Sequence, residues 1–242
     1  DQNVQSLVLI FGTGQMATDN PRYTPQTIKI IHDFLQQPNF SNSSQVTLYG
    51  TGEQNSSEAI ASSESHSQDS TWFEQTNTPT DGVFNVANFR NLMNLASQTQ
   101  AKNLVTIAVG HGSQEGGLST WADNKGLTPR IYEEATKAFS GRHIMVSGSC
   151  FSGQFAHIPD CGFFAAPPDL TSYGCWQGPT PSPRRDYLYL FFKKAKDYDG
   201  DGKISFREAH FSSFKEGVPQ DSPYSSMDAL VDRAFDELLN RP

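Results

Sequence analysis

The chain has 242 residues, enough for one domain with a buried core and an appendage. Its 26 acidic and 18 basic residues give a net charge of -8, which excludes a nucleic-acid backbone as the main partner because phosphate binding requires a basic face. No apolar run approaches the roughly 20 residues of a membrane span, and the start at Asp1 fits either a removed signal peptide or a trimmed chain.

Apolar, β-branched runs alternate with amphipathic stretches along the chain. Buried strands are predicted at 4–11, 46–49, 104–109 and 143–147, with a shorter fifth at 162–166. Helical spacing of apolar residues predicts helices at 24–37, 86–97 and 129–139. This alternation indicates an α/β fold with a mostly parallel sheet and helices on both sides.

Two further segments depart from this alternation. Residues 53–81 are rich in Ser, Thr, Asn and Gln, so most of this segment is predicted to be a long exposed loop, of the kind that carries function or is cut. From Ser205 onward the chain again looks helical, and it ends in an apolar stripe that runs from Met227 to Leu238.

The glycines after the first strand imitate a dinucleotide-binding fingerprint, with Gly12, Gly14 and Ala17 at the expected spacing. That motif needs a helix that begins at its glycines. Pro21 and Pro25 delay the helix to about residue 24, so we set an oxidoreductase aside.

Two predicted strands end in reactive side chains. The strand at 104–109 runs into Gly110-His111-Gly112, and the strand at 143–147 runs into Gly148-Ser149-Cys150. Open α/β sheets place their sites at the carboxyl ends of parallel strands, so a thiol and an imidazole 39 residues apart are expected to meet. Taken singly, Cys150 is more often an inert thiol and His111 a turn residue, but the paired arrangement favours catalysis.

The chemistry explains why these residue types would occur together. A thiolate is a strong nucleophile, and an imidazole delivers a proton to a leaving amine near neutral pH. The flanking glycines leave room for a substrate backbone and let peptide N–H groups point at an oxyanion. The other cysteines, Cys161 and Cys175, are either a disulfide or two packed thiols.

The motifs Gly-His-Gly-Ser at 110–113 and Ser-Cys-Phe-Ser-Gly at 149–153 resemble the two catalytic motifs of legumain-type cysteine peptidases. The segment 162–175 is similar to the stretch that follows the nucleophile strand in that family. The resemblance implies a caspase/legumain-like three-layer α/β/α sandwich over residues 1–192, with a C-terminal helical EF-hand-like appendage over 193–242 packed on it.

The resemblance also implies roles for individual residues. Cys150 would attack the scissile carbonyl, His111 would handle the proton, and backbone N–H groups at Gly112 and Cys150 would hold the oxyanion. Asn20 would orient His111. The side chain before the cut bond would be read by Arg22, Ser172, Thr171 and Asp186.

One position departs from the family pattern. Legumains carry an acid two residues before the nucleophile, where this chain has Gly148. A guanidinium binds a carboxylate or an amide oxygen well, so Arg22 still favours cleavage after Asp or Asn. The departure weakens the family's preference for Asn specifically.

The segment 197–208 matches a complete twelve-residue EF-hand loop and is the most specific motif in the chain. Closely spaced carboxylates repel one another unless a cation lies among them. We therefore expect a calcium ion held by Asp197, Asp199, Asp201, Lys203 through its carbonyl, Ser205 and Glu208. The alternative is an acidic surface turn.

The predicted activity is that of a cysteine endopeptidase that acts on proteins or peptides through a thioester, with autoprocessing within the loop 53–81. A single calcium loop suits a calcium-rich exterior, so a secreted or periplasmic location is expected. A peptide ligase would share the same thioester. The alternative from another class is a catalytically silent calcium-binding interaction module.

Overall fold

The structure is a computed structural model of the 242-residue chain. The structure describes residues 5–13, 23–50, 52, 59–60, 72–73, 80–121, 123–172, 186–216 and 224–225. None of the helices in these ranges has the length and the apolar character of a membrane span.

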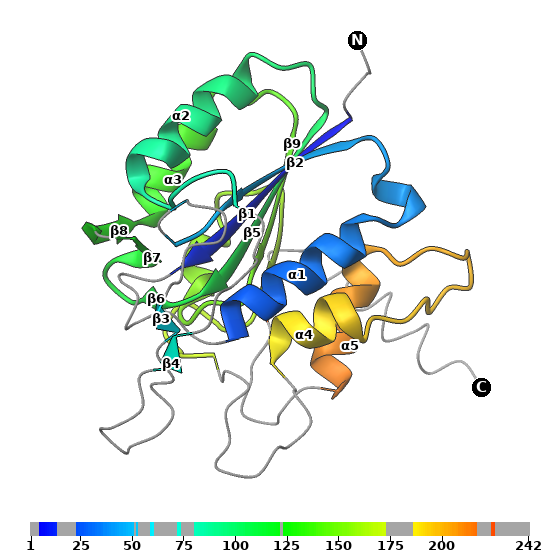
Figure 1. Ribbon diagram of the computed structural model, residues 1–242. Coiled ribbons are helices and arrows are strands. Elements are labelled where there is room, and N and C mark those ends of the chain that lie inside the picture. The colour runs from blue at the N-terminus through cyan, green and yellow to red at the C-terminus, as the bar shows by residue number, and fades with distance from the viewer. Residues whose placement is uncertain are drawn as a thin grey trace.

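A six-stranded sheet forms the centre of the molecule (Figure 1), in the order β11-β10-β9-β5-β1-β2. Its strands are β1 (Ser6–Thr13), β2 (Ser43–Leu48), β5 (Asn103–Gly110), β9 (Arg142–Ser147), β10 (Cys161–Phe164) and β11 (Tyr224–Ser225). All neighbours are parallel except β11, which runs antiparallel to β10. The five strands expected from sequence are confirmed, with ends that differ by up to three residues.

Helices cover both faces of this sheet, which gives three layers (Figure 1). One face carries α1 (Tyr23–Leu35), α4 (Tyr187–Lys193) and α5 (Phe206–Glu216), and the other carries α2 (Val86–Ser97) and α3 (Pro129–Thr136). Two short 3-10 helices, η2 (Pro38–Phe40) and η3 (Ser152–Phe155), follow α1 and β9. The helix α1 begins at Tyr23, close to the start at about residue 24 that the prolines predicted.

Local sequence explains where three of these helices begin. The side chains of Asn85, Thr128 and Asp186 accept hydrogen bonds from backbone N–H groups three residues later, at the first turns of α2, α3 and α4. Such caps satisfy N–H groups that have no partner within the helix. Pro129, in the first turn of α3, also favours the start of this helix, because the proline ring holds φ near the helical value.

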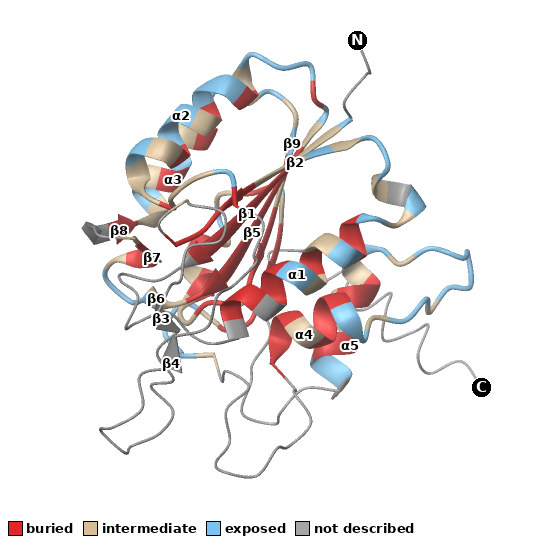
Figure 2. Ribbon diagram, viewed as in Figure 1, coloured by how far each residue is buried: buried red, intermediate tan, exposed pale blue. Residues whose placement is uncertain are grey.

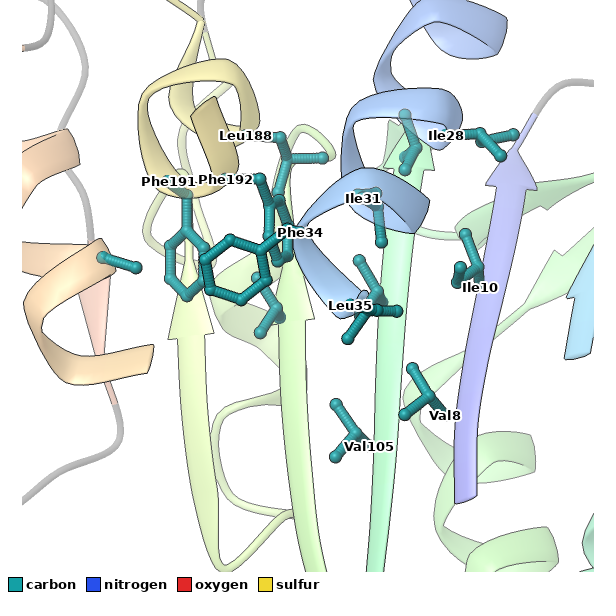
Figure 3. Packing of buried hydrophobic residues seen from close by; sticks show 14 of the residues in the cluster. Val8, Ile10, Ile28, Ile31, Phe34, Leu35, Val105, Leu188, Phe191 and Phe192 are labelled. Carbon is teal, nitrogen blue, oxygen red and sulfur yellow. The ribbon is translucent and has the colours of Figure 1, made fainter. Parts of the chain in front are cut away.

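The strands are buried on both faces because the sheet separates two apolar clusters (Figure 2). Along β1, Val8 and Ile10 face α1, where they meet Ile28 and Ile31 (Figure 3). The alternate residues of β1 face α2 and α3 and join the second cluster. Continuous apolar runs of this kind are typical of parallel strands covered by helices.

The C-terminal part of the described chain packs into the same core as the sheet. Ala209 of α5 is fully buried in the cluster that contains Phe191 of α4, and Phe206 packs against it. The domain boundary at 192/193 stays a prediction, and the apolar stripe between Met227 and Leu238 lies outside the described residues.

Two small sheets lie apart from the central one. A three-stranded sheet is formed by β6 (Gly112–Ser113), β7 (Gly117–Thr120) and β8 (Asp123–Leu127). Within the segment expected to be one long loop, β3 (Ala59–Ile60) pairs antiparallel with β4 (Trp72–Phe73). These four residues are strand, which could not be predicted because cross-strand pairing is not visible as a local pattern. The prediction that most of residues 53–81 form a long exposed loop stays a prediction.

Candidate active site

The two predicted catalytic segments meet at the carboxyl ends of adjacent strands. Ala108 of β5 is in register with Ser147 of β9, and the Gly148 N–H donates to the Ala108 carbonyl at 3.0 Å. Beyond the strands, a Cβ atom on Gly112 would lie 2.4 Å from the Cys150 carbonyl oxygen. Only glycine permits this approach, and it brings the backbone that follows His111 against the nucleophile segment.

Cys150 sits at the start of a sharp turn. Phe151, the next residue, adopts a left-handed conformation with φ of 55°, which is unusual for a bulky side chain. The turn is held because the Phe151 N–H donates to Leu170 O at 2.8 Å and the Gly153 N–H donates to Ala166 O at 2.9 Å. These bonds fix the half-buried Cys150 at the rim of the sheet.

The Cys150 thiol contacts Ser172. The sulfur donates to the Ser172 carbonyl oxygen at 3.6 Å and lies 3.8 Å from its hydroxyl. That hydroxyl donates in turn to Gly148 O at 3.0 Å. Ser172 therefore contacts both Cys150 and Gly148, while its neighbour Thr171 is exposed, and the predicted roles of both residues toward the substrate stay predictions.

His111 precedes the hairpin of β6 and β7. Its carbonyl oxygen accepts a hydrogen bond from Ser119 N–H at 3.2 Å, and the residue is half-buried. Between the two segments, Nε2 of Gln154 in η3 donates to Ser113 O at 3.0 Å. This contact could not be predicted from the sequence, because residue spacing does not indicate the partner of a glutamine that follows a nucleophile motif.

Three predicted site residues remain: Asp186 and Arg22 of the pocket, and Asn20, which was expected to orient His111. Asp186 is buried and caps α4, with Oδ1 accepting from the Tyr189 N–H at 3.0 Å. Its predicted role toward substrate stays a prediction. Asn20 and Arg22 lie outside the described residues.

The structure gives a steric reason for Gly148, the position where legumains have an acid. A Cβ atom at this position would lie 2.5 Å from Cδ1 and 2.6 Å from Cγ of Leu188 in α4. Leu188 is itself buried among α1 and α4 residues (Figure 3). The side chain of Leu188 therefore occupies the volume that an acidic side chain at position 148 would need. This contact between α4 and the nucleophile segment could not be predicted from the sequence.

The loop at 197–208 is folded around its own carboxylates. Asp197 accepts from the N–H groups of Gly200 at 2.7 Å and Gly202 at 2.8 Å. Gly202 has φ of 79°, the left-handed conformation that a glycine at the sixth position of such a loop permits. Asp201 accepts from the Lys203 N–H at 2.8 Å.

Glu208 closes this loop from the first turn of α5. It is buried and accepts four hydrogen bonds, from the N–H groups of Tyr198 and Asp199 and from both the N–H and the hydroxyl of Ser205. Burial acts to raise the pKa of Glu208, but these hydrogen bonds together outweigh it and lower the pKa. Glu208 is thus held as a carboxylate.

Three of the predicted calcium ligands converge. One carboxylate oxygen from each of Asp197, Asp199 and Glu208 lies within 4.8 Å of the others. Hard oxygen donors at this spacing fit a calcium ion, whose ligands are carboxylates, carbonyls and hydroxyls. Asp201 and Lys203 are exposed on the same loop, and Ser205 contacts Glu208 through its hydroxyl at 2.9 Å.

Comparison with known proteins gave matches at the level of structure alone. No protein-family model matches the sequence, and no curated protein matches it. Among solved structures, "iotapain", a secreted C11 cysteine protease from Bacteroides thetaiotaomicron, matches with a TM-score of 0.50 at 8% identity. The match covers 95% of this chain and 68% of that one. The chain has a caspase-like α/β fold.

Two further solved structures are similar over most of this chain. Caspase-1 from Spodoptera frugiperda matches with a TM-score of 0.48 at 9% identity and covers 93% of this chain and 87% of that one. The C11 protease of B. thetaiotaomicron in complex with an irreversible peptide inhibitor matches with a TM-score of 0.45 at 11% identity. That match covers 88% of this chain and 57% of the protease.

Proposed function

We propose that this chain is a cysteine endopeptidase with Cys150 as nucleophile and His111 as its proton-transfer partner. The observation that carries the proposal is the close approach of Gly112 to the Cys150 carbonyl oxygen at the carboxyl edge of β5 and β9. This approach brings the two reactive segments together, and a catalytic Cys-His pair needs that juxtaposition. The caspase-like fold, shared with structures named as cysteine proteases, supports the same reading.

The proposed reaction follows from the chemistry of these groups. The Cys150 thiolate attacks the carbonyl carbon of the scissile peptide bond, and the C–N bond breaks as His111 donates a proton to the leaving amine. Water then hydrolyses the thioester and releases the acid. Backbone N–H groups of Gly112 and Cys150 are proposed to hold the oxyanion, with Asn20 orienting the imidazole.

For the substrate, we propose a protein or peptide with Asp or Asn before the cut bond. Arg22 would bind the side-chain oxygen, with Ser172, Thr171 and Asp186 at the pocket wall. Because Leu188 fills the space beside Gly148, position 148 contributes no acidic side chain to the proposed pocket. A pocket without that acid favours substrates with an acidic or amide side chain before the cut bond over substrates with a basic one. Matched fluorogenic peptides that differ only at this residue test the preference, and faster cleavage after Lys or Arg would contradict it.

Active-site labelling tests the activity itself. A peptidyl acyloxymethyl ketone should label wild-type protein at Cys150, and Cys150→Ala should lose both the label and peptide hydrolysis. His111→Ala should keep the fold and lose at least about 100-fold in kcat, the usual contribution of a positioned proton donor. An unlabelled wild-type thiol would instead favour a silent interaction module.

We further propose that the loop 197–208 binds calcium as a structural ion. Asp197, Asp199 and Glu208 supply the convergent carboxylates, with Asp201, the Lys203 carbonyl and Ser205 as the remaining donors. When bound, the ion would neutralise the mutual repulsion of these acids. A calcium-rich, secreted or periplasmic setting suits such a single loop.

Isothermal titration with calcium tests this part independently of catalysis. Wild-type protein should bind one calcium ion, and Glu208→Gln should weaken binding by at least tenfold. Lys203→Ala is the matched control because it keeps the backbone carbonyl that the loop would use. Equal affinity for wild type and Glu208→Gln would contradict the site.

A further inference from the structure

Gln154 links the segment that carries the thiol to the segment that carries the imidazole. It lies in η3, four residues after Cys150, and its side-chain amide donates to the carbonyl oxygen of Ser113, two residues after His111. The bond therefore crosses between the two halves of the proposed dyad, which come from strand ends 39 residues apart in sequence.

The η3 side of this bond is rigidly held. Gly153, beside Gln154, donates its N–H to Ala166 O at 2.9 Å, and a Cβ atom on it would lie 2.8 Å from the backbone of Pro167. On the other side of Gln154, Phe155 is fully buried and packs edge to face against Tyr132. The backbone that carries the amide is thus fixed by the core.

The histidine side is anchored through its hairpin partner β7, because Leu118 is fully buried in the second apolar cluster. The strand β6 has only two residues, and Ser113 is exposed. The strand pairs with Leu118 and Gly117 of β7, and the Ser113 hydroxyl accepts from the Gly116 N–H at 2.9 Å. The backbone of Gly112 in this hairpin also packs against Cys150, and the Gln154 amide adds a side-chain hydrogen bond between the hairpin and the nucleophile turn.

We propose that Gln154 is a positioning residue that holds the His111 hairpin at the distance from Cys150 that proton transfer requires. This inference rests on the proposed peptidase function. Gln154 acts through Ser113 and touches neither reacting atom. A misplacement of about 1 Å in such a constellation can cost up to about 100-fold in rate, so a lost tether should lower kcat more than it lowers substrate binding.

The test uses three substitutions at one position. Gln154→Glu keeps the size but replaces the donor with a carboxylate that repels the Ser113 carbonyl. Gln154→Met keeps the length with no donor, and Gln154→Lys restores a donor on a flexible side chain. His157→Ala, at an exposed residue of the same turn, is the control for changes that do not touch the hairpin.

We expect kcat to fall about 5- to 30-fold in Gln154→Glu and Gln154→Met, with KM within about twofold of wild type. Gln154→Lys should recover at least half of the wild-type kcat, and His157→Ala should match wild type. The pH dependence of kcat/KM should broaden or shift in the two donor-free variants, because the imidazole is held less closely to the thiol.

Thermal unfolding of all variants separates positioning from folding. The proposal would be overturned if kcat fell in proportion to the melting temperature in every variant and Gln154→Lys recovered no activity. Wild-type kcat in Gln154→Glu would overturn it as well. If the ketone probe labels wild-type Cys150, either result refutes the role of Gln154 alone, whereas an unlabelled wild type refutes the peptidase function.

Discussion

The Tyr187 hydroxyl lies 2.7 Å from Nδ1 of His210, a hydrogen bond that joins α4 to α5. A second bond joins the same helices, because the Ser213 hydroxyl donates to the Tyr187 carbonyl at 3.2 Å. The helix α5 begins inside the proposed calcium loop, and Leu188 of α4 packs on Gly148, two residues before Cys150. A continuous set of contacts therefore connects the loop to the nucleophile turn.

Chelation should consequently affect the active site as well as the loop. Without calcium, the carboxylates of Asp197, Asp199 and Glu208 repel one another, so α5 should loosen and α4 should lose part of its support. We expect excess chelator to lower both the melting temperature and peptide hydrolysis of wild-type protein, and calcium to restore both. Lys203→Ala should respond like wild type; an unchanged wild-type activity and melting temperature would exclude the coupling.

Tyr187→Phe should weaken that coupling without removing the calcium site. Loss of the bond to His210 should cost about 1 kcal/mol, which lowers the melting temperature of a chain of this size by about 2–4 °C. Calcium affinity should stay within about threefold of wild type, while the ratio of activity with calcium to activity with chelator should fall. Activity assays and calorimetry measure the two quantities.

A substitution elsewhere on α5 provides the control for Tyr187→Phe. Phe214 is 64% exposed, so Phe214→Ala changes the helix surface away from α4. Its calcium response should equal that of wild type. An identical response in Tyr187→Phe and Phe214→Ala would mean that the α4–α5 bond does not transmit the effect.

Gly148→Ala should destabilise the fold because its methyl group meets Leu188. We expect a loss of about 1–3 kcal/mol in the free energy of unfolding, the usual cost of overpacking. Leu188→Ala should cost about 2–5 kcal/mol by cavity formation. The double variant should lose at least about 1 kcal/mol less than the sum of the two single losses, because the space left by Leu188→Ala accommodates the methyl group added by Gly148→Ala.

Gly82→Ala is the matched control for this cycle. A Cβ atom there would meet Leu48 at 3.4 Å, an ordinary contact, so the cost should stay below about 1 kcal/mol. Chemical denaturation of the four variants measures all these values. Strict additivity of Gly148→Ala and Leu188→Ala would show that the cost of Gly148→Ala does not come from a clash with Leu188.

His143 should make stability depend on pH below neutrality. Its Nε2 lies 2.7 Å from the Tyr132 hydroxyl, and burial lowers the pKa of His143 from 6.5 to about 4. Because the unfolded chain binds this proton more readily, the neutral histidine contributes its full stability above about pH 6.5. That contribution is lost as the pH falls toward 4, by up to about 3 kcal/mol at about 1.4 kcal/mol per pH unit.

Denaturation of wild type and His143→Gln at several values between pH 7 and pH 4 checks this expectation. The variant should be less stable at pH 7 and should have a shallower pH slope. His157→Gln, at an exposed residue, should keep the wild-type slope. Equal slopes in wild type and His143→Gln would show that other groups cause the pH dependence.

Several features of this protein were predictable from the sequence because they are local. Apolar runs of strand length predicted the parallel sheet, and the residues just after two of those runs predicted that His111 and Cys150 would lie at one edge. The segment 197–208 is contiguous, so its ligand pattern could be recognised without a fold, and three of its carboxylates do converge.

Tertiary structure decided the contacts that join these local features. The contacts of Leu188 with Gly148, of Gln154 with Ser113 and of Tyr187 with His210 each connect residues more than 20 positions apart. Such contacts leave no periodic signal in the sequence, because they depend on which helix covers which strand end. The sequence determined which reactive groups are present and at which edge of the sheet, and packing determined what holds them there.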